Sequence, residues 1–217
     1  MKITGLKPAG RRPGFISIEA GGVRMGVLPV EEIRALGIAV GAEFDGEGAE
    51  RVLTALERVK AYDAAVRLLA VRGRAVQEIM TRLRRKGLRA DAVEHAVGRL
   101  ESEGLLDDVV MAREYARLRA GRGYGRARIL AELSRRGVER RVAERAVAEL
   151  GGDDEGERRE AMMALARKRA GQLRGVEREA ARRRIAGYLA RRGYVGSEIW
   201  RVAGDALSDA EDDSSGP

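Results

Sequence analysis

The sequence predicts a mainly α-helical protein, a tandem array of three three-helix repeats of the helix-turn-helix kind, preceded by a small β-rich N-terminal module. Three observations lead to this fold class. Runs of β-branched residues alternate with other residues only near the start of the chain. From Ala49 onward, apolar residues recur with the 3.6-residue period of a helix. Basic residues followed by glycine recur at Gly87, Gly137 and Gly193, which are 50 and 56 residues apart, and this spacing indicates an internal repeat.

The predicted N-terminal module covers residues 1–48. Its segments ITGL, FISIEA and VRMGVL are interrupted by glycine and proline, so we expect three short strands. Pro29 suits the first turn of a helix, where its missing N–H costs no hydrogen bond. A short helix is therefore expected from Val30 to Leu36, ending at Gly37.

Each predicted repeat contains two helices joined at the glycine and a further helix before them. In the first repeat, Val76, Ile79 and Leu83 lie on one face of the helix that ends at Gly87. The leading helices are expected at about 50–72, 107–120 and 155–173. Corresponding positions carry apolar residues in all three repeats: Ile79, Ile129 and Ile185; Leu83, Leu133 and Leu189; Leu88, Val138 and Tyr194; Ala96, Ala146 and Val202.

This alignment places the repeats at 49–104, 105–152 and 153–207. The remaining residues, 208–217, read SDAEDDSSGP and have no apolar period. We expect them to form a disordered acidic tail.

The chain is basic, with a formal net charge of +8. The excess lies in the repeats, because residues 51–207 hold 36 basic and 23 acidic side chains. This distribution favours a polyanionic partner or an acidic protein surface.

The composition excludes several kinds of site. The chain has no cysteine and one histidine, His95, which excludes disulfides, thiolate zinc sites and histidine clusters for metals. No nucleophile–base pair is recognisable, so we expect a non-enzymatic protein with no catalytic residue, no metal and no cofactor. No apolar run approaches the ~20 residues of a membrane span, and the first residues lack the apolar core of a signal peptide. We therefore expect a cytoplasmic monomer that does not contact membranes.

The basic residues before the three glycines are candidate contact residues, and two explanations fit them. Cations in the last helical turn complement the helix dipole, and glycine adopts the left-handed conformation that ends a helix. A periodic basic edge that binds a partner is the second explanation, and both can hold together. The candidates are Arg84, Arg85 and Lys86 in the first repeat, Arg135 and Arg136 in the second, and Arg191 and Arg192 in the third.

A glycine-rich segment, GRGYG at 121–125, precedes a predicted helix. It lacks the Gly-x-x-x-x-Gly-Lys-Ser/Thr pattern of a phosphate-binding loop. We interpret it as a loop that lets a helix begin close to its neighbour. Surface contacts with a partner are expected from Arg122, Tyr124, Arg126 and Arg128.

Five further residues have a functional and a structural interpretation, and we prefer the structural one. Asp107 and Asp108 are expected to cap a helix N-terminus rather than to bind a metal. His95 is expected to be a partly buried packing residue. Tyr194 and Trp200 occupy positions that are apolar in the other repeats, so we expect both in the core rather than as platforms for nucleic-acid bases.

The repeats resemble those of the RecX family of regulatory proteins over roughly residues 58–204. The first repeat contains AYDAAVRLLAVRGRAVQEIMTRLRRKG, and the third contains YLARRGYVGSEIWRV. The second opens with the element Leu106-Asp107-Asp108, although Met111 stands where the family usually has phenylalanine. It continues into a stretch similar to the family's pattern at Gly125, Ile129, Glu132, Leu133, Arg136 and Gly137.

The resemblance implies a function as well as a fold. Proteins of this family modulate RecA, the bacterial recombinase. By resemblance, this chain is expected to regulate homologous recombination, DNA repair and the SOS response. It would bind the RecA–single-stranded-DNA filament and limit the growth, ATP hydrolysis and strand exchange of that filament. Direct contact with single-stranded or duplex DNA is left open, as is the sign of the effect.

The alternative is a helix-turn-helix-type DNA-binding protein that acts without a recombinase. Such a protein would place base-reading polar residues at the start of the same helix in each repeat. The corresponding segments, RADAVEH, ERRVAER and VGSEIWR, share only their apolar positions. This difference favours a scaffold that displays a different surface in each repeat.

Overall fold

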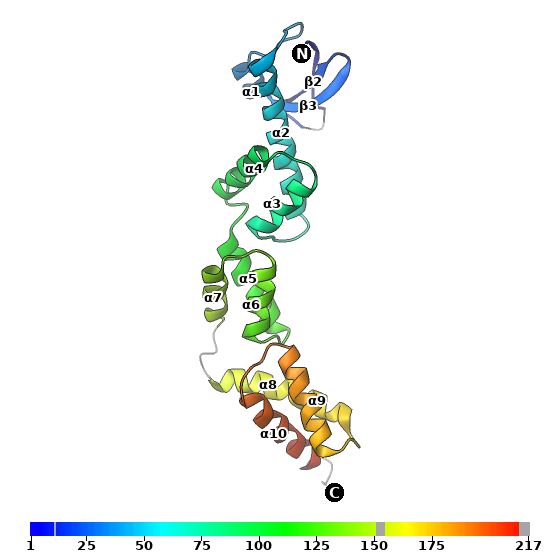
Figure 1. The fold of residues 1–217 in the computed structure, drawn as a ribbon, viewed down its shortest axis with the longest axis vertical. Helices are drawn as coiled ribbons and strands as arrows, with labels where there is room; N and C mark the ends of the chain where they lie inside the picture. The colour runs from blue at the N-terminus through cyan, green and yellow to red at the C-terminus, as the bar shows by residue number, and fades with distance from the viewer. Residues whose placement is uncertain (11, 151–154, 213–217) are drawn as a thin grey trace. The chain divides into compact units, whose positions relative to one another are not determined.

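The computed structural model describes residues 1–10, 12–150 and 155–212 (Figure 1). The chain divides into two compact units, one that ends at Asp107 and one that begins at Asp108. A small antiparallel sheet is followed by three repeats of three α-helices each, so the predicted fold class is confirmed.

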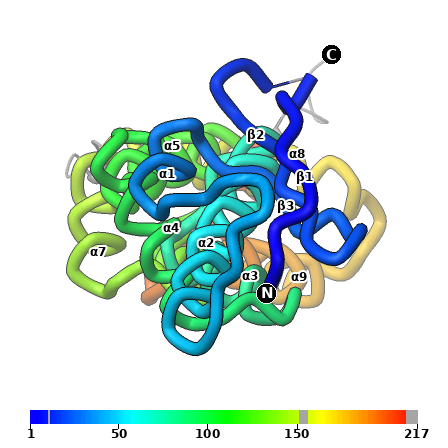
Figure 2. The backbone as a smooth tube through the Cα atoms, turned by 90° about the horizontal axis from the view of Figure 1, so that it is seen from above, coloured from blue at the N-terminus to red at the C-terminus, as the bar shows by residue number. Residues whose placement is uncertain are grey.

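The three strands are adjacent and antiparallel, in the order β1 Ile3–Pro8, β2 Phe15–Ala20 and β3 Val23–Pro29 (Figure 2). Gly21 and Gly22 join β2 to β3 with φ angles of 56° and 79°. A two-residue hairpin turn with positive φ at both positions matches the twist of the strands and favours glycine. Ile3, Ile18 and Leu28, one from each strand, are buried in the core of this module.

Helix α1 (Val30–Ala35) follows β3 directly. Pro29 lies at its N-cap, and Gly37, with φ of 64°, lies just beyond its last turn. Both boundaries agree with the expected helix to within one residue.

Helix α2 (Gly46–Leu69) belongs to two cores at once. Its first half contributes Val52 and Val59 to the core beneath the sheet. Its second half contributes Ala61 and Ala65 to the core of the first repeat. The boundary expected between residues 48 and 49 is therefore wrong, because it falls inside one continuous helix that closes both cores.

The first repeat is completed by α3 (Val76–Arg85) and α4 (Ala90–Ser102). Ile79 and Leu83 of α3 are fully buried against Val93 of α4, as the helical period predicted. The second repeat has the same plan, built from α5 Asp108–Gly121, α6 Arg126–Arg135 and α7 Arg140–Ala148.

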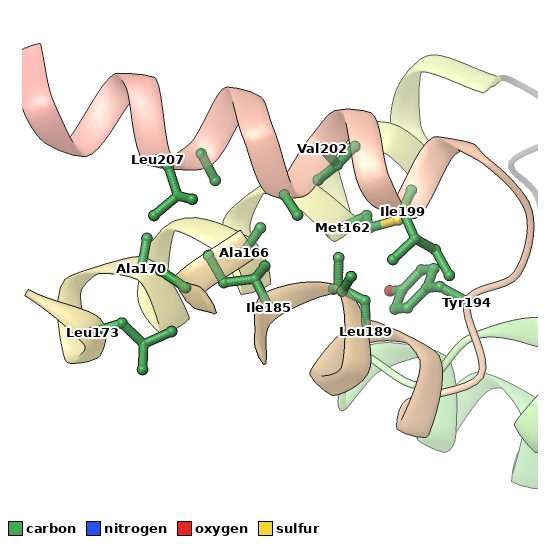
Figure 3. Close-up of a cluster of buried hydrophobic side chains, with 14 residues drawn as sticks. Met162, Ala166, Ala170, Leu173, Ile185, Leu189, Tyr194, Ile199, Val202 and Leu207 are labelled. Atoms are coloured by element: carbon green, nitrogen blue, oxygen red, sulfur yellow. The ribbon is translucent and has the colours of Figure 1, made fainter. Parts of the chain in front are cut away.

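The third repeat begins with α8 (Glu155–Ala170), which continues into a short 3₁₀ turn. It ends with α9 (Arg178–Arg191) and α10 (Glu198–Asp212). All three helices contribute to its core, which Figure 3 shows in close-up. Tyr194 lies in this core and is 8% exposed, so its predicted burial is confirmed.

The predicted disordered tail is wrong in its first part, because residues 208–212 continue α10. Ser208 Oγ accepts a hydrogen bond from Arg178 Nη2 (3.0 Å), and Asp209 pairs with Arg167 at 2.8 Å. Ala210 packs against the core of the repeat. Because these polar residues bond to neighbouring helices, α10 continues beyond its last regularly spaced apolar residue. Residues 213–217 lie outside the described part of the chain.

We predict that Leu133→Ala lowers the free energy of unfolding by ~2–5 kcal/mol, because Leu133 is fully buried and its truncation leaves a cavity. Chemical denaturation monitored by circular dichroism measures this loss. The control is Arg117→Ala, which changes an exposed residue of α5 and should shift stability by no more than about 0.5 kcal/mol. Equal effects of the two substitutions would contradict the assigned burial of Leu133.

Candidate functional site

The three basic turns share one backbone conformation. Gly87, Gly137 and Gly193 have φ angles of 77°, 83° and 91°. In each turn the glycine N–H donates to the carbonyl of the residue three positions earlier, at 2.8–2.9 Å. The structure thus confirms that these glycines end the helices, because only glycine adopts this left-handed conformation without strain.

The basic side chains of the first turn extend into solvent. Arg84 pairs loosely with Glu94, with 3.5 Å between Nη2 and Oε1. Arg85 and Lys86 are exposed, and neither makes an ion pair with a residue that the structure describes. Two cations are therefore displayed at this helix end.

The second turn displays one cation and packs the other. Arg135 is exposed, and its Nε donates to the carbonyl of Ala131 on its own helix (3.2 Å). Arg136 is half-buried, with its guanidinium 4.3 Å from the centre of the Tyr115 ring. Cation–π contact of this kind holds a side chain against the protein rather than in solvent.

The third turn forms a contact between the second and third repeats. The N–H of Gly125 donates to the carbonyl of Arg192 (2.8 Å). Arg128 Nη1 donates to the carbonyl of Arg191 (2.8 Å), and Arg192 Nη1 donates to the carbonyl of Arg122 (2.7 Å). Charge-assisted bonds in both directions therefore tie the end of α9 to the loop before α6.

This contact requires glycine on both sides. A Cβ on Gly125 would lie 2.4 Å from the carbonyl oxygen of Gly193. A Cβ on Gly193 would lie 2.4 Å from Cβ of Arg128. The interpretation of residues 121–125 as a loop that lets a helix begin close to its neighbour is thereby confirmed, and the neighbour is the turn of the third repeat.

Tyr124 is enclosed by arginines at the same contact. The guanidinium carbons of Arg119, Arg128 and Arg192 lie 3.9, 4.5 and 5.1 Å from the centre of its ring. Of the residues expected to form surface contacts, Tyr124, Arg128 and Arg192 thus have internal partners.

Glu132, on α6, holds this arrangement together. Its Oε2 accepts hydrogen bonds from Tyr115 (2.8 Å) and from Arg119 Nε (2.6 Å), and its Oε1 accepts one from Arg128 Nε (3.0 Å). Burial disfavours the charged carboxylate, but hydrogen bonds from Arg119, Tyr115 and Arg128 outweigh this cost and lower the pKa of Glu132 to about 2. The sequence pattern contained Glu132 but gave no sign of this role.

The remaining candidates differ in exposure. The side chains of Arg122 and Arg191 are exposed, whereas Arg126 is half-buried. Arg126 lines a cavity of about 370 Å³ between the second and third repeats. Its charged lining residues are Arg126, Arg158, Glu157 and Glu198, so the two signs of charge are balanced there.

Two predictions about buried positions were wrong. His95 is exposed on α4, because Val93, Ala96, Val97 and Leu100 occupy its buried face. Trp200 is 44% exposed on α10. Ile199 takes the core position, and the next residue on a helix points about 100° away from it. The 3.6-residue period of the apolar residues in α4 and α10 leaves both residues outside the buried stripe.

Asp107 precedes α5 and Asp108 begins it, as expected for residues at a helix N-terminus. Within residues 1–10, 12–150 and 155–212, no three acidic, histidine or cysteine side chains come together in a way that could hold a metal ion. None of the described helices is both long and apolar enough to span a bilayer.

Comparison with protein-family models matches each repeat in turn. The model of the first three-helix domain of RecX matches residues 61–100, the second matches 107–147, and the third matches 155–203. Together these matches cover more than half of the chain.

Curated relatives carry the same family name. The chain is 36% identical over 149 residues to "Regulatory protein RecX" of Amycolatopsis mediterranei, covering 68% of this chain and 83% of the relative. It is 34% identical over 150 residues to the protein of that name from Streptomyces coelicolor, covering 69% of this chain and 78% of the relative.

Solved structures show the same fold. "Crystal structure of regulatory protein RecX" matches with a TM-score of 0.73 and 20% identity, covering 94% of this chain and 98% of that one. RecX from Lactobacillus salivarius matches with a TM-score of 0.60 and 22% identity, covering 70% and 97%. Three consecutive three-helix repeats, each with a basic glycine turn between its second and third helices, define a helical-repeat protein. The chain belongs to the RecX family of regulatory proteins.

We predict that Gly125→Ala destabilises the contact between the second and third repeats, because the added methyl group meets backbone atoms of Gly193. The expected cost is ~1–3 kcal/mol, as for other overpacked sites, measured by thermal unfolding. The matched control is Gly121→Ala in the same segment, where a Cβ meets no atom within 4 Å. If both variants unfold like the wild type, the close approach of the two glycines is refuted.

A further prediction concerns the substitution Glu132→Gln. The folded-state pKa of Glu132 lies below the usual value of 4.5, so its charge contributes stability above about pH 4.5, and this contribution is lost as pH falls toward about 2. At neutral pH the variant should be less stable than the wild type by about 2–3 kcal/mol. The difference should shrink between pH 4.5 and pH 2, as measured by urea denaturation at each pH. Glu114→Gln, which changes an exposed carboxylate of α5, serves as the control. A pH-independent difference would rule out the proposed ionisation.

Proposed function

We propose that this chain is a non-enzymatic regulator of homologous recombination that binds the RecA–single-stranded-DNA filament and limits its growth, ATP hydrolysis and strand exchange. The observation that carries the proposal is the order of the family matches, one to each three-helix repeat at 61–100, 107–147 and 155–203. The name of the curated relatives, a regulatory protein, supports the same class of activity.

The exposed cations of the first two repeats support a contact with such a filament. Arg85 and Lys86 of the first repeat and Arg135 of the second are exposed without an ion pair to a described residue. Cations that lack an internal ion pair remain attractive to a polyanion or an acidic protein surface. A filament that contains DNA and protein offers both.

The alternative, DNA binding without a recombinase, receives less support from the corresponding helix starts. At the start of α4, Asp91 pairs with Arg89, and at the start of α10, Glu198 pairs with Arg158. At the start of α7, Arg140 pairs with Glu144 one turn later. Arg141 of α7 and Arg201 of α10 are exposed without an ion pair to a described residue, whereas the first turn of α4 has no such cation. The three helix starts therefore do not share one set of open polar donors, which a repeated groove-reading helix would need.

Binding along a filament would allow a few molecules of this protein to inhibit many recombinase protomers. A regulator seated on a filament affects many recombinase protomers, since growth and coupled ATP hydrolysis depend on neighbours. Substoichiometric protein should therefore depress DNA-dependent ATP hydrolysis by the recombinase.

The test is a charge reversal of the exposed turn residues. The triple variant Arg85→Glu, Lys86→Glu and Arg135→Glu leaves the glycine turns intact and omits Arg136, which packs on Tyr115. We predict at least a tenfold loss of affinity for the assembled filament, equivalent to ~1.4 kcal/mol, with a matching loss of ATPase inhibition. Co-sedimentation with the filament and a coupled ATPase assay measure the two effects.

The matched control reverses Arg34, Arg51 and Lys60, three exposed cations of the N-terminal part of the chain, and gives the same net charge. Filament binding that is equally weak in both triple variants would reflect net charge alone. Wild-type binding to naked duplex as strong as to the filament would favour the alternative function. No binding to the filament in the presence of a non-hydrolysable ATP analogue would overturn the proposal.

A further inference from the structure

Helix α10 of the third repeat has two flanks of different character. Its acidic side chains at positions 198, 205 and 209 lie seven and four residues apart, a spacing that puts them on one side of a helix. All three pair with arginines of α8: Glu198 with Arg158 (3.4 Å), Asp205 with Arg159 (2.7 Å) and Asp209 with Arg167 (2.8 Å). These carboxylates are therefore engaged on the α8 side.

The opposite flank, beside α9, carries Trp200. Arg182 of α9 reaches across, with its Nε donating to the carbonyl of Trp200 (3.3 Å) and its guanidinium carbon 5.9 Å from the indole. The indole is 44% exposed, which is unusual for the largest apolar side chain. The next residue, Arg201, is also exposed, but it points about 100° away from Trp200 and lines a cavity with Arg159 and Glu198 on the α8 side.

The surface next to the indole is open. Gly204 lies one helical turn after Trp200, where a larger side chain would cover the ring. A Cβ at Gly204 would meet only Arg182 Nε, at 3.8 Å. The carboxylate that approaches Arg182 is Glu179, at 3.7 Å. Trp200 therefore offers an uncovered aromatic surface beside the guanidinium group of Arg182.

We propose that Trp200 and Arg182 form a contact site for single-stranded nucleic acid. A base would stack on the indole, while the guanidinium group of Arg182 contacts a neighbouring phosphate. Base–aromatic stacking combined with basic side chains is the general way in which proteins hold single strands, and it needs no particular base. This inference rests on the proposed function, because it names single-stranded DNA as the component of the filament that the third repeat contacts.

Nucleic acid fits this surface better than an apolar protein partner does. A protein interface core excludes charge, whereas here the aromatic ring lies beside the cation of Arg182, and Glu198, Asp205 and Asp209 pair on the α8 side. Planar guanidinium groups suit phosphate oxygens, and they stack on bases as well.

The experiment uses the full chain and its single tryptophan as the probe. Oligo(dT) of about 15 nucleotides, a length within the usual site size, is added to the wild-type protein without recombinase. Stacking should quench the Trp200 fluorescence in a saturable manner. The binding constant should fall with salt, with a log–log slope of about −0.7 for each phosphate contacted.

Variants separate stacking from charge, with binding measured by the anisotropy of labelled oligo(dT). Trp200→Leu should bind about tenfold more weakly, and Trp200→Phe should recover most of the affinity because the aromatic face is retained. Arg182→Gln should weaken binding, whereas Arg184→Gln, an exposed arginine of the same helix with the same change in charge, should not. Circular dichroism confirms that each variant is folded.

Three results would overturn this inference. Unquenched Trp200 fluorescence at saturating oligo(dT) would remove the stacking contact, as would wild-type affinity of Trp200→Leu. A fluorescence change with recombinase protein but not with oligo(dT) would identify a protein contact instead. The oligo(dT) measurements contain no recombinase, so their failure leaves the test of filament regulation standing on its own.

Discussion

The tight turn at one glycine is the constraint on which each repeat depends. The helices it joins are short, with 10 and 13 residues in the first repeat, 10 and 9 in the second, and 14 and 15 in the third. Helices of this length are marginal in isolation, so most of their stability comes from packing against a neighbour. The left-handed glycine folds the second helix back at once, and residues such as Leu83 and Val93 then meet in a common core.

Arginine serves several physical purposes in this chain, which is why net charge alone is a poor guide to its contacts. Arg119 and Arg128 hold Glu132, while Arg136 covers the ring of Tyr115 and Arg192 joins two repeats. Each role uses the planar, multidentate guanidinium group, which lysine does not offer. Cations such as Lys86 have no such internal role, so they are the ones available to a partner.

The repeats share an apolar framework but not their charged surfaces. At corresponding positions the first repeat carries Glu78 and Arg82, whereas the second carries Arg128 and Glu132, so the same pair is reversed. The third repeat has Arg184 and Tyr188 at these positions, and it exposes Trp200 on its last helix. A regulator built in this way presents a distinct surface at each step, which suits a composite partner made of protein and nucleic acid.

By itself the sequence determined the features that follow from local geometry. The strand segments, the short helix after Pro29 and the glycine turns were predictable, because each depends on backbone preferences within a few residues. The apolar period also identified core residues such as Leu133 and Tyr194. The family resemblance was likewise readable from motifs such as Leu106-Asp107-Asp108, and the comparisons confirmed it.

Only the tertiary structure decided which charged and aromatic side chains are free. It showed that Arg192 is engaged in a contact between repeats, although its turn has the same backbone as that of Lys86. It also showed that α2 closes two cores and that α10 continues through the acidic residues after Leu207. The physical reason is that a helical period identifies the buried stripe, whereas the environment of each flank depends on neighbours that are distant in sequence.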